Sequence, residues 1–359
     1  MALTRDLISD ARARYFLEKD RYLKLARLVS EICQKQVIQE NVIRATTQWR
    51  AKAPKRFEDK LIKWLDDPTK AERLSKIHTL EDLFQEAGGD LAGVRITTYV
   101  ETDRRLVVEA IQAIFTGPNA NVLVDEKDTS ARQRGSLYRA THCQVAIKDE
   151  DLTGDNENLR GQTCEIQVCS LLAHVWNEIE HDMGYKPLAG ELSSLERDLL
   201  SVLGKETEAG DLVISNLLEA KEKRLAERGG VFIDEYDFVA KMRTSFPNAS
   251  RFGANAGQLY LDLVSLEINN MDLIRSQVIR DDTPEDAAAL VDQLSQYIRN
   301  KNDDKVVLDS ESSDLMLMLL LKNRIEDVLS LHQLGRGAGR PPRIASVATR
   351  YRDMRNNAD

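Results

Sequence analysis

No apolar run in this chain approaches the roughly 20 residues that are needed to cross a bilayer. The longest such run lies around Leu315–Leu321. The N-terminal segment MALTRDLISDARARYFLEKD has charges every few residues and lacks the apolar stretch and small-residue cleavage site of an export signal. We therefore expect a cytoplasmic protein.

Cysteine and net positive charge are also scarce. The four cysteines form no C-x-x-C pair, which argues against a zinc ribbon and a disulfide framework and favours reduced, buried thiols. The net charge is -9, with 50 Lys and Arg against 59 Asp and Glu. This balance disfavours a general nucleic-acid binder, because phosphate affinity requires a concentrated basic surface.

The order of apolar patterns predicts an α+β fold, in which a mixed β-sheet flanked by helices precedes a mostly helical C-terminal region. Helical spacing extends from Leu7 to about Trp49 and resumes after Pro54, which suits the first turn of a helix. Segments rich in β-branched residues then predict strands, with one helix after the first of them and a polar loop before the last. The strands are expected at 93–100, 121–126, 138–147 and 163–170, the helix at 103–115 and the loop at 149–161.

The length of 359 residues and the shifts in composition suggest more than one domain. We expect an N-terminal helical segment at 1–44, a central domain at 45–190 and a helical region at 191–335. Residues 336–359 are rich in Gly, Pro and Arg, which predicts a flexible basic tail.

A basic cluster opens the central domain. Arg50 and Lys52 precede the helix that begins near Pro54, and Lys60 and Lys63 share one face of that helix. Arginine and lysine in this arrangement are suited to hold a triphosphate. The alternative is an ordinary solvated helix face.

Two carboxylates stand at the starts of predicted strands. Asp90 precedes an apolar strand and suits a magnesium ligand, although a turn-forming Asp is the alternative. Asp90 and Arg95 are an odd number of residues apart, so they face opposite sides unless the strand starts after Asp90. Glu165 lies among apolar strand residues and shares a face with Gln167. A charge there is costly unless it is paired or bound to metal.

Two further segments carry groups that suit a nucleotide site. Tyr138 and His142 share a strand face, where a tyrosine can stack on a purine and a histidine can reach a phosphate or ribose. A half-buried core aromatic is the alternative for this tyrosine. The following helix has the spacing H-x-x-x-E-x-x-H from His174 to His181, which differs from the H-E-x-x-H of zinc proteases and disfavours catalytic zinc.

Taken in order, these motifs resemble the synthetase domain of the RelA/SpoT family, a nucleotidyltransferase-like core, over about residues 45–190. The resemblance implies that Asp90 and Glu165 bind Mg²⁺ and that Arg95 stabilises a phosphate beside them. It implies ATP contacts from Arg50, Lys52, Lys60 and Lys63. It places near the acceptor nucleotide Tyr138, which stacks on the base, together with His142, Gln167, His174 and Glu180. Glu180, His181, Tyr185 and Lys186 match the E-H-x-x-x-Y-K signature of the family.

Three departures from the family pattern fall on the acceptor side. Leu137 stands where the family usually has Gly, Cys169 where an arginine is common, and His174 where Asn is frequent. The donor assignment is therefore firmer than the acceptor assignment.

The activity implied by the resemblance is pyrophosphate transfer from ATP to the 3′-hydroxyl of GDP or GTP, which makes an alarmone, (p)ppGpp. Glu165 then accepts the hydroxyl proton or helps magnesium to lower the hydroxyl pKa; the sequence leaves both roles open. The alternatives are a toxic member that modifies adenine nucleotides or the tRNA 3′ end under the control of an antitoxin partner or of its C-terminal region, and an inactive nucleotide sensor. The first 50 residues contain no histidine, so the family's hydrolase module is not expected. The C-terminal region is a candidate for oligomerisation or for restraint of activity.

Overall fold

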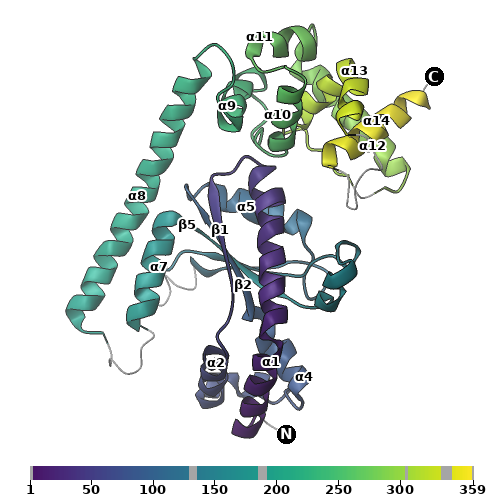
Figure 1. Ribbon diagram of the computed structural model, residues 1–359. Coiled ribbons are helices and arrows are strands. Elements are labelled where there is room, and N and C mark those ends of the chain that lie inside the picture. Colours follow the sequence, from purple (N-terminus) through teal and green to yellow (C-terminus); the bar gives the residue numbers. More distant parts are fainter. Residues whose placement is uncertain (1–2, 129–135, 185–191, 304–305, 333–341, 358–359) are drawn as a thin grey trace. The chain divides into compact units, whose positions relative to one another are not determined.

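The computed structural model describes residues 3–128, 136–184, 192–303, 306–332 and 342–357 (Figure 1). The chain divides into two compact units, one made of residues 1–38 and 43–216 and the other of residues 39–42 and 217–359. Among the helices described, none combines the length and apolar character that spanning a membrane requires.

The first unit is built on a five-stranded sheet. Its strands are β1 (Ala45–Ala51), β2 (Ala92–Thr98), β3 (Leu123–Glu126), β4 (Thr141–Val145) and β5 (Cys164–Ser170), in the spatial order β1-β2-β5-β4-β3. β2 and β5 pair in parallel and the other neighbours pair antiparallel, which confirms the predicted mixed sheet.

Strand β1 was not predicted, because the helical pattern was expected to continue to Trp49. Thr46, Thr47 and Trp49 are β-branched or aromatic and suit the pleated surface of an edge strand. β1 pairs along its whole length with β2, with Ala45 opposite Thr98 and Ala51 opposite Ala92. Tertiary pairing with β2 therefore overrides the local helical pattern.

Helices surround this sheet. They are α1 (Arg5–Ile32), α2 (Pro54–Asp66), α3 (Ala71–Leu74), α4 (Leu80–Ala87), α5 (Asp103–Ile114), α7 (Leu171–Gly184) and α8 (Ser194–Ala226), and α1 runs on into a π-helical turn, Cys33–Gln39. Thr4 caps α1, and a capping box of Thr79 and Asp82 opens α4. Pro54 is the first residue of α2, as predicted.

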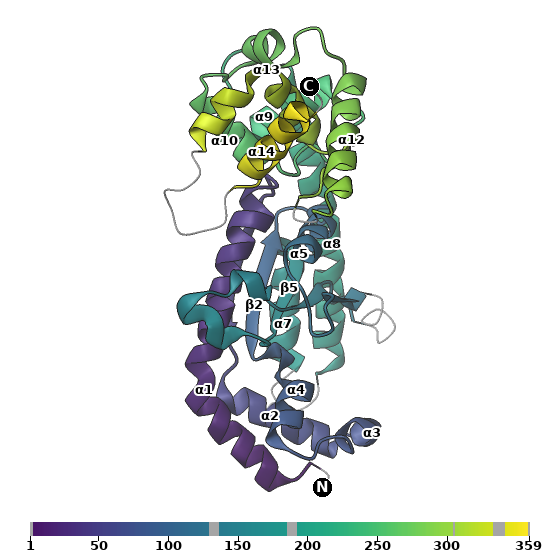
Figure 2. The ribbon, with the colours of Figure 1, turned by 90° about the vertical axis from the view of Figure 1, so that its right-hand side faces the viewer.

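The two faces of the sheet have different roles. Val94, Ile96, Ile166 and Val168 are buried in the hydrophobic core, to which α1 and α5 also contribute. Figures 1 and 2 show both helices beside the sheet. Because side chains alternate along a strand, the residues between these four lie on the opposite face. That face carries Arg95, Glu165 and Gln167, and α7 packs there with Ala173 against Cys169.

The first unit extends beyond the predicted boundary near residue 190, because the beginning of α8 packs on α7. The indole N–H of Trp176 donates to the carbonyl oxygen of Leu200 at 2.9 Å. Gly204 and Gly210 allow the helices to approach, since a Cβ added at Gly210 would lie 2.6 Å from Cδ1 of Leu172. Residues up to Asn216 therefore belong to this unit.

The second unit is helical, as the sequence predicted. It contains α9 (Glu235–Ser245), α10 (Ala256–Ser265), α11 (Met271–Leu273), α12 (Pro284–Asn300), α13 (Asp314–Leu331) and α14 (Arg343–Asn356), with a π-helical turn at Ile274–Ile279. The apolar run Leu315–Leu321 is buried in α13. Residues 39–42 belong to this unit, because the amide of Gly257 donates to the carbonyl oxygen of Glu40 at 3.0 Å.

The expectation of a flexible tail at 336–359 is wrong for residues 343–356, which form α14. Ile344, Val347, Ala348 and Tyr351 recur at helical spacing and are buried against the core of the second unit. Arg343 begins the helix and forms two hydrogen bonds of 2.6 Å with the buried carboxylate of Asp314. Apolar burial and this forked ion pair give the segment a fixed place.

We predict that Arg343→Ala destabilises the protein by about 3 kcal/mol, because it leaves the Asp314 carboxylate buried without its charge partner. Urea denaturation followed by far-UV circular dichroism measures the change. Arg355→Ala, an exposed substitution in the same helix, is the control and should change stability little. Equal stability of the two variants would contradict this account of α14.

Candidate active site

The turn before β2 places Asp90 at one end of the sheet. Gly88–Asp90 form a 3₁₀ turn and β2 starts only at Ala92, so Asp90 and Arg95 do not share a regular strand. Gly89 brings this turn against β4, because a Cβ at Gly89 would lie 1.9 Å from Nε2 of Gln144. Gln144 is the strand partner of Glu165, so the turn approaches the second carboxylate.

Asp90 is held by two lysines of the predicted donor cluster. Lys52 forms an ion pair with Oδ2 of Asp90, and Nζ of Lys60 lies 2.9 Å from Oδ1. Lys60 also donates to the carbonyl oxygen of Ala87 at 2.9 Å. Burial lowers the pKa of Lys60, against the opposing effect of Asp90. The two ammonium groups are thus concentrated at the carboxylate and are only about a quarter exposed.

Two polar side chains on the same face of the sheet contact the carboxylate of Glu165. Nδ1 of His142 lies 3.2 Å from Oε1, and Nε2 of Gln167 donates to Oε2 at 2.7 Å. Burial by itself would raise the pKa of Glu165, but the hydrogen bond and charge of His142, the Gln167 amide and the charge of Lys52 together lower it to about 2. These partners therefore offset the free-energy cost that we expected for a buried charge at Glu165.

Asp90 and Glu165 lie within electrostatic reach of the same two lysines. Glu165 is the strand partner of Gly93, three residues beyond Asp90. Lys60 responds electrostatically to both carboxylates, and Lys52 is ion-paired with Asp90 and lowers the pKa of Glu165. Two carboxylates beside cationic groups fit Mg²⁺, which prefers oxygen ligands and takes one or two from the protein together with phosphate oxygens.

Arg95 lies next to Gln167 and α7. Its Nη2 is 2.8 Å from Oε1 of Glu178 and 3.4 Å from Oε1 of Gln167. His174, one turn before Glu178, has a lowered pKa because of burial and the nearby charge of Arg95. The face of the sheet that carries Glu165, Gln167 and Arg95, named the carboxylate face below, therefore has one arginine, with a histidine biased toward its neutral form beside it.

Tyr138 is joined to the carboxylates through His142. Its hydroxyl lies 3.0 Å from Nε2 of His142, whose other ring nitrogen faces Glu165. The tyrosine and histidine rings meet edge-on with centroids 6.1 Å apart. Burial raises the pKa of the Tyr138 hydroxyl, so the phenol stays neutral at ordinary pH. The chain of contacts Tyr138–His142–Glu165 unites two motifs that the sequence analysis treated separately.

The remaining predicted residues lie around this centre. Arg50 is exposed on β1 opposite Gly93, and Lys63 is exposed on α2 one turn beyond Lys60. Glu180 accepts a hydrogen bond of 3.3 Å from the hydroxyl of Ser136. Tyr185 and Lys186, the end of the E-H-x-x-x-Y-K signature, lie outside the described residues.

The sequence analysis did not identify Asn177 and Asp128, which bind the backbone of the two residues after Tyr138. Asn177 accepts from the amide of Arg139 at 3.3 Å and donates to its carbonyl oxygen at 3.1 Å. Asp128 accepts from the amide of Ala140 at 3.0 Å. Nothing local in the sequence marks these residues, because their role follows from contacts between separate elements.

Part of the chain is similar to a known family. Residues 50–189 match the family described as "Region found in RelA / SpoT proteins". Residues 50–189 are thus similar to a RelA/SpoT region. The matched residues include every residue of the carboxylate face described above and end before α8.

A relative and two solved structures are similar to the chain. GTP pyrophosphokinase YjbM from Bacillus subtilis (strain 168) is 32% identical over 97 residues, which span 27% of this chain and 42% of the relative. A GTP pyrophosphokinase family protein from Streptococcus pneumoniae is 17% identical and matches 59% of this chain and 96% of its own, with a TM-score of 0.43. Small alarmone synthetase 1 from Bacillus subtilis is 18% identical over 59% of this chain and 97% of its own, with a TM-score of 0.42.

We predict that His142→Ala raises the pKa of Glu165 from about 2 toward its ordinary value of 4.5, because the largest favourable contribution is removed. A pKa depressed in the folded state stabilises the fold above about pH 4.5, and this contribution is lost as the pH falls toward 2. Carbon-13 NMR of labelled glutamate measures the titration. His78→Ala, at an exposed histidine, should leave the Glu165 pKa in place.

Proposed function

We propose that the chain is a magnesium-dependent pyrophosphokinase that transfers pyrophosphate from ATP to the 3′-hydroxyl of GDP or GTP. This proposal is supported by the interaction of both Asp90 and Glu165 with Lys52 and Lys60, within residues that match the RelA/SpoT region. The name of the Bacillus subtilis relative, GTP pyrophosphokinase, indicates the same chemistry.

The donor side supplies charge compensation for a triphosphate. Lys52 and Lys60 converge on Asp90, while Arg50 and Lys63 stand exposed on the flanking β1 and α2. Mg²⁺ held by Asp90 and Glu165 would add compensation for the charge on the transferred group. A triphosphate that engages the two lysines would free Asp90 from its ion pairs.

The acceptor side positions a nucleoside and its hydroxyl. In the proposed transfer the acceptor oxygen bonds to the β-phosphorus of ATP, the bond from that phosphorus to the oxygen of AMP breaks, and the hydroxyl proton is released. Tyr138 would stack on the base while His142 and Gln167 orient the hydroxyl near Glu165. A carboxylate with a pKa of about 2 is a weak proton acceptor near neutral pH, which favours the cation-binding role for Glu165 over that of general base.

We predict that Asp90→Asn and Glu165→Gln each lower the rate of transfer by about 10²–10³-fold while the fold is kept, because each substitution removes a negative charge that would hold Mg²⁺ beside the transferred phosphates. The assay follows label from γ-labelled ATP onto GDP or GTP. Glu157→Gln, an exposed substitution in the same region, is the matched control. Near-normal transfer in either site variant would contradict the role of the carboxylates.

The acceptor is tested in the same assay with parallel reactions that contain GDP, GTP, AMP, ADP or tRNA. Label on the guanine nucleotides alone is the expected result. Label on tRNA or adenine nucleotides instead would overturn the proposed acceptor, and ATP binding without transfer to any of them would overturn the proposed enzyme.

We predict that Tyr138→Ala weakens the use of acceptor while Tyr138→Phe retains most of it. Stacking of an aromatic ring on a base contributes about 1–3 kcal/mol, and phenylalanine keeps the ring but loses the contact with His142. Steady-state kinetics with acceptor varied at saturating ATP give the KM for the acceptor. Equal acceptor KM values for Tyr138→Ala and the exposed control Tyr99→Ala would argue against stacking.

A further inference from the structure

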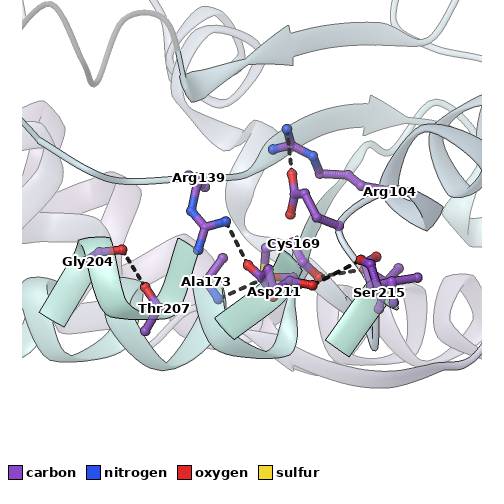
Figure 3. Close-up of polar contacts among 12 residues, drawn as sticks. Arg104, Arg139, Cys169, Ala173, Gly204, Thr207, Asp211 and Ser215 are labelled. Atoms are coloured by element: carbon purple, nitrogen blue, oxygen red, sulfur yellow. Dashed lines mark hydrogen bonds and ion pairs between the residues drawn. The ribbon is translucent and has the colours of Figure 1, made fainter. Parts of the chain in front are cut away.

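A buried ion pair joins helix α8 to the segment that carries Tyr138. Nη1 of Arg139, the residue after Tyr138, lies 2.7 Å from Oδ2 of Asp211 on α8 (Figure 3). Ser170, at the end of β5, donates to the same oxygen at 2.8 Å. The side chains of Arg139 and Asp211 are 8% and 4% exposed, so the two charges meet almost without water.

This ion pair is better suited to setting a geometry than to adding stability. Among the described residues, Nη2 of Arg139 and Oδ1 of Asp211 make no hydrogen bond, so the pair is not the two-bond fork that arginine forms at its strongest. Desolvation offsets much of the attraction in a buried ion pair. Removing one charge, however, leaves the other buried and drives the arginine to a new position.

Side-chain hydrogen bonds also fix the backbone of Arg139 and Ala140, the two residues after Tyr138. Asn177 of α7 binds both the amide and the carbonyl of Arg139, and Asp128 accepts from the amide of Ala140. A movement of the Arg139 side chain would therefore be transmitted to the backbone that fixes Tyr138, because the contacts lie on adjacent residues.

A second contact links α8 to the other side of Tyr138. A Cβ added at Gly204 would lie 2.4 Å from Cδ1 of Leu137 and 2.9 Å from Nε1 of Trp176. Leu137 therefore occupies space that only a glycine at 204 leaves open. The residues before and after Tyr138 therefore both contact α8. Leu137 lies beside Gly204 and Arg139 pairs with Asp211, seven residues further along that helix.

We propose that α8, which lies beyond the RelA/SpoT region, positions Tyr138 for the acceptor nucleotide, with Asp211 as the positioning residue acting through Arg139. This inference rests on the proposed function for its effect on catalysis. The placement of Tyr138 by α8 can be measured without any catalysis.

Hydrogen–deuterium exchange of the full-length protein without nucleotide tests the placement. Asp211→Asn keeps the shape of the side chain and removes its charge, and exchange is expected to become about tenfold faster at Tyr138, Arg139 and Ala140 while a peptide from α4 is unchanged. Asp198→Asn, exposed on the same helix, is the matched control. Unchanged exchange at 138–140, or an equal increase in all peptides, would overturn the proposal.

Kinetics test the consequence for the acceptor. Asp211→Asn is expected to raise the KM for the acceptor about tenfold and to leave the KM for ATP unchanged, because only the stacking partner is displaced. A fall in kcat with both KM values unchanged would show loss of folded enzyme and overturn the positioning role. Absence of transfer by the unmodified protein would instead refute the proposed function, and the exchange experiment would still decide the placement.

Two more variants separate placement from stability. Arg139→Gln with Asp211→Asn leaves no buried unpaired charge, so thermal stability is expected to recover while the KM for the acceptor stays raised. Gly204→Ala displaces Leu137 without touching the ion pair and is expected to raise the acceptor KM in the same way. A normal acceptor KM in both variants would overturn the proposal.

Discussion

The parallel pairing of β2 with β5 is the constraint on which the rest of the first unit depends. Parallel strands begin at the same edge of a sheet, so the turn that ends at Asp90 comes near the start of β5, where Glu165 is the second residue. A slip of one residue would turn Glu165 and Gln167 into the core and expose Ile166. The register that buries the apolar residues is therefore also the register that assembles the carboxylate face.

Each ionised group on this face has a counterpart. Asp90 is paired with two lysines, Glu165 with His142 and Arg95 with Glu178. These side chains are partly exposed, so a charged ligand can reach them. The pairing keeps Glu165 ionised, and its lowered pKa corresponds to a stabilised folded state. In the proposed function a polyanion and a cation would replace these partners, while the strands that carry them stay fixed.

Local patterns in the sequence were sufficient for the strands of the carboxylate face and for the anomaly of Glu165, because alternation and strand edges are local properties. They failed for β1, where pairing with β2 decides the conformation, and for α14, where the glycines and prolines before Arg343 obscured the helical spacing of Ile344 and Tyr351. They also could not show that His142 links Tyr138 to Glu165. That link depends on the register of β4 against β5, which no single segment reveals.

Two of the three departures from the family pattern on the acceptor side, Cys169 and Leu137, pack against the helices around them. Cys169 is buried against Tyr138 and Ala173, and burial raises the pKa of its thiol to about 12, so it serves as a small apolar surface beneath the tyrosine. An arginine would bring a charge into this space. Leu137 fills the gap that Gly204 leaves in α8. Cys169 and Leu137 thus pack around the segment that carries Tyr138, and close packing leaves a side chain less freedom than solvent does.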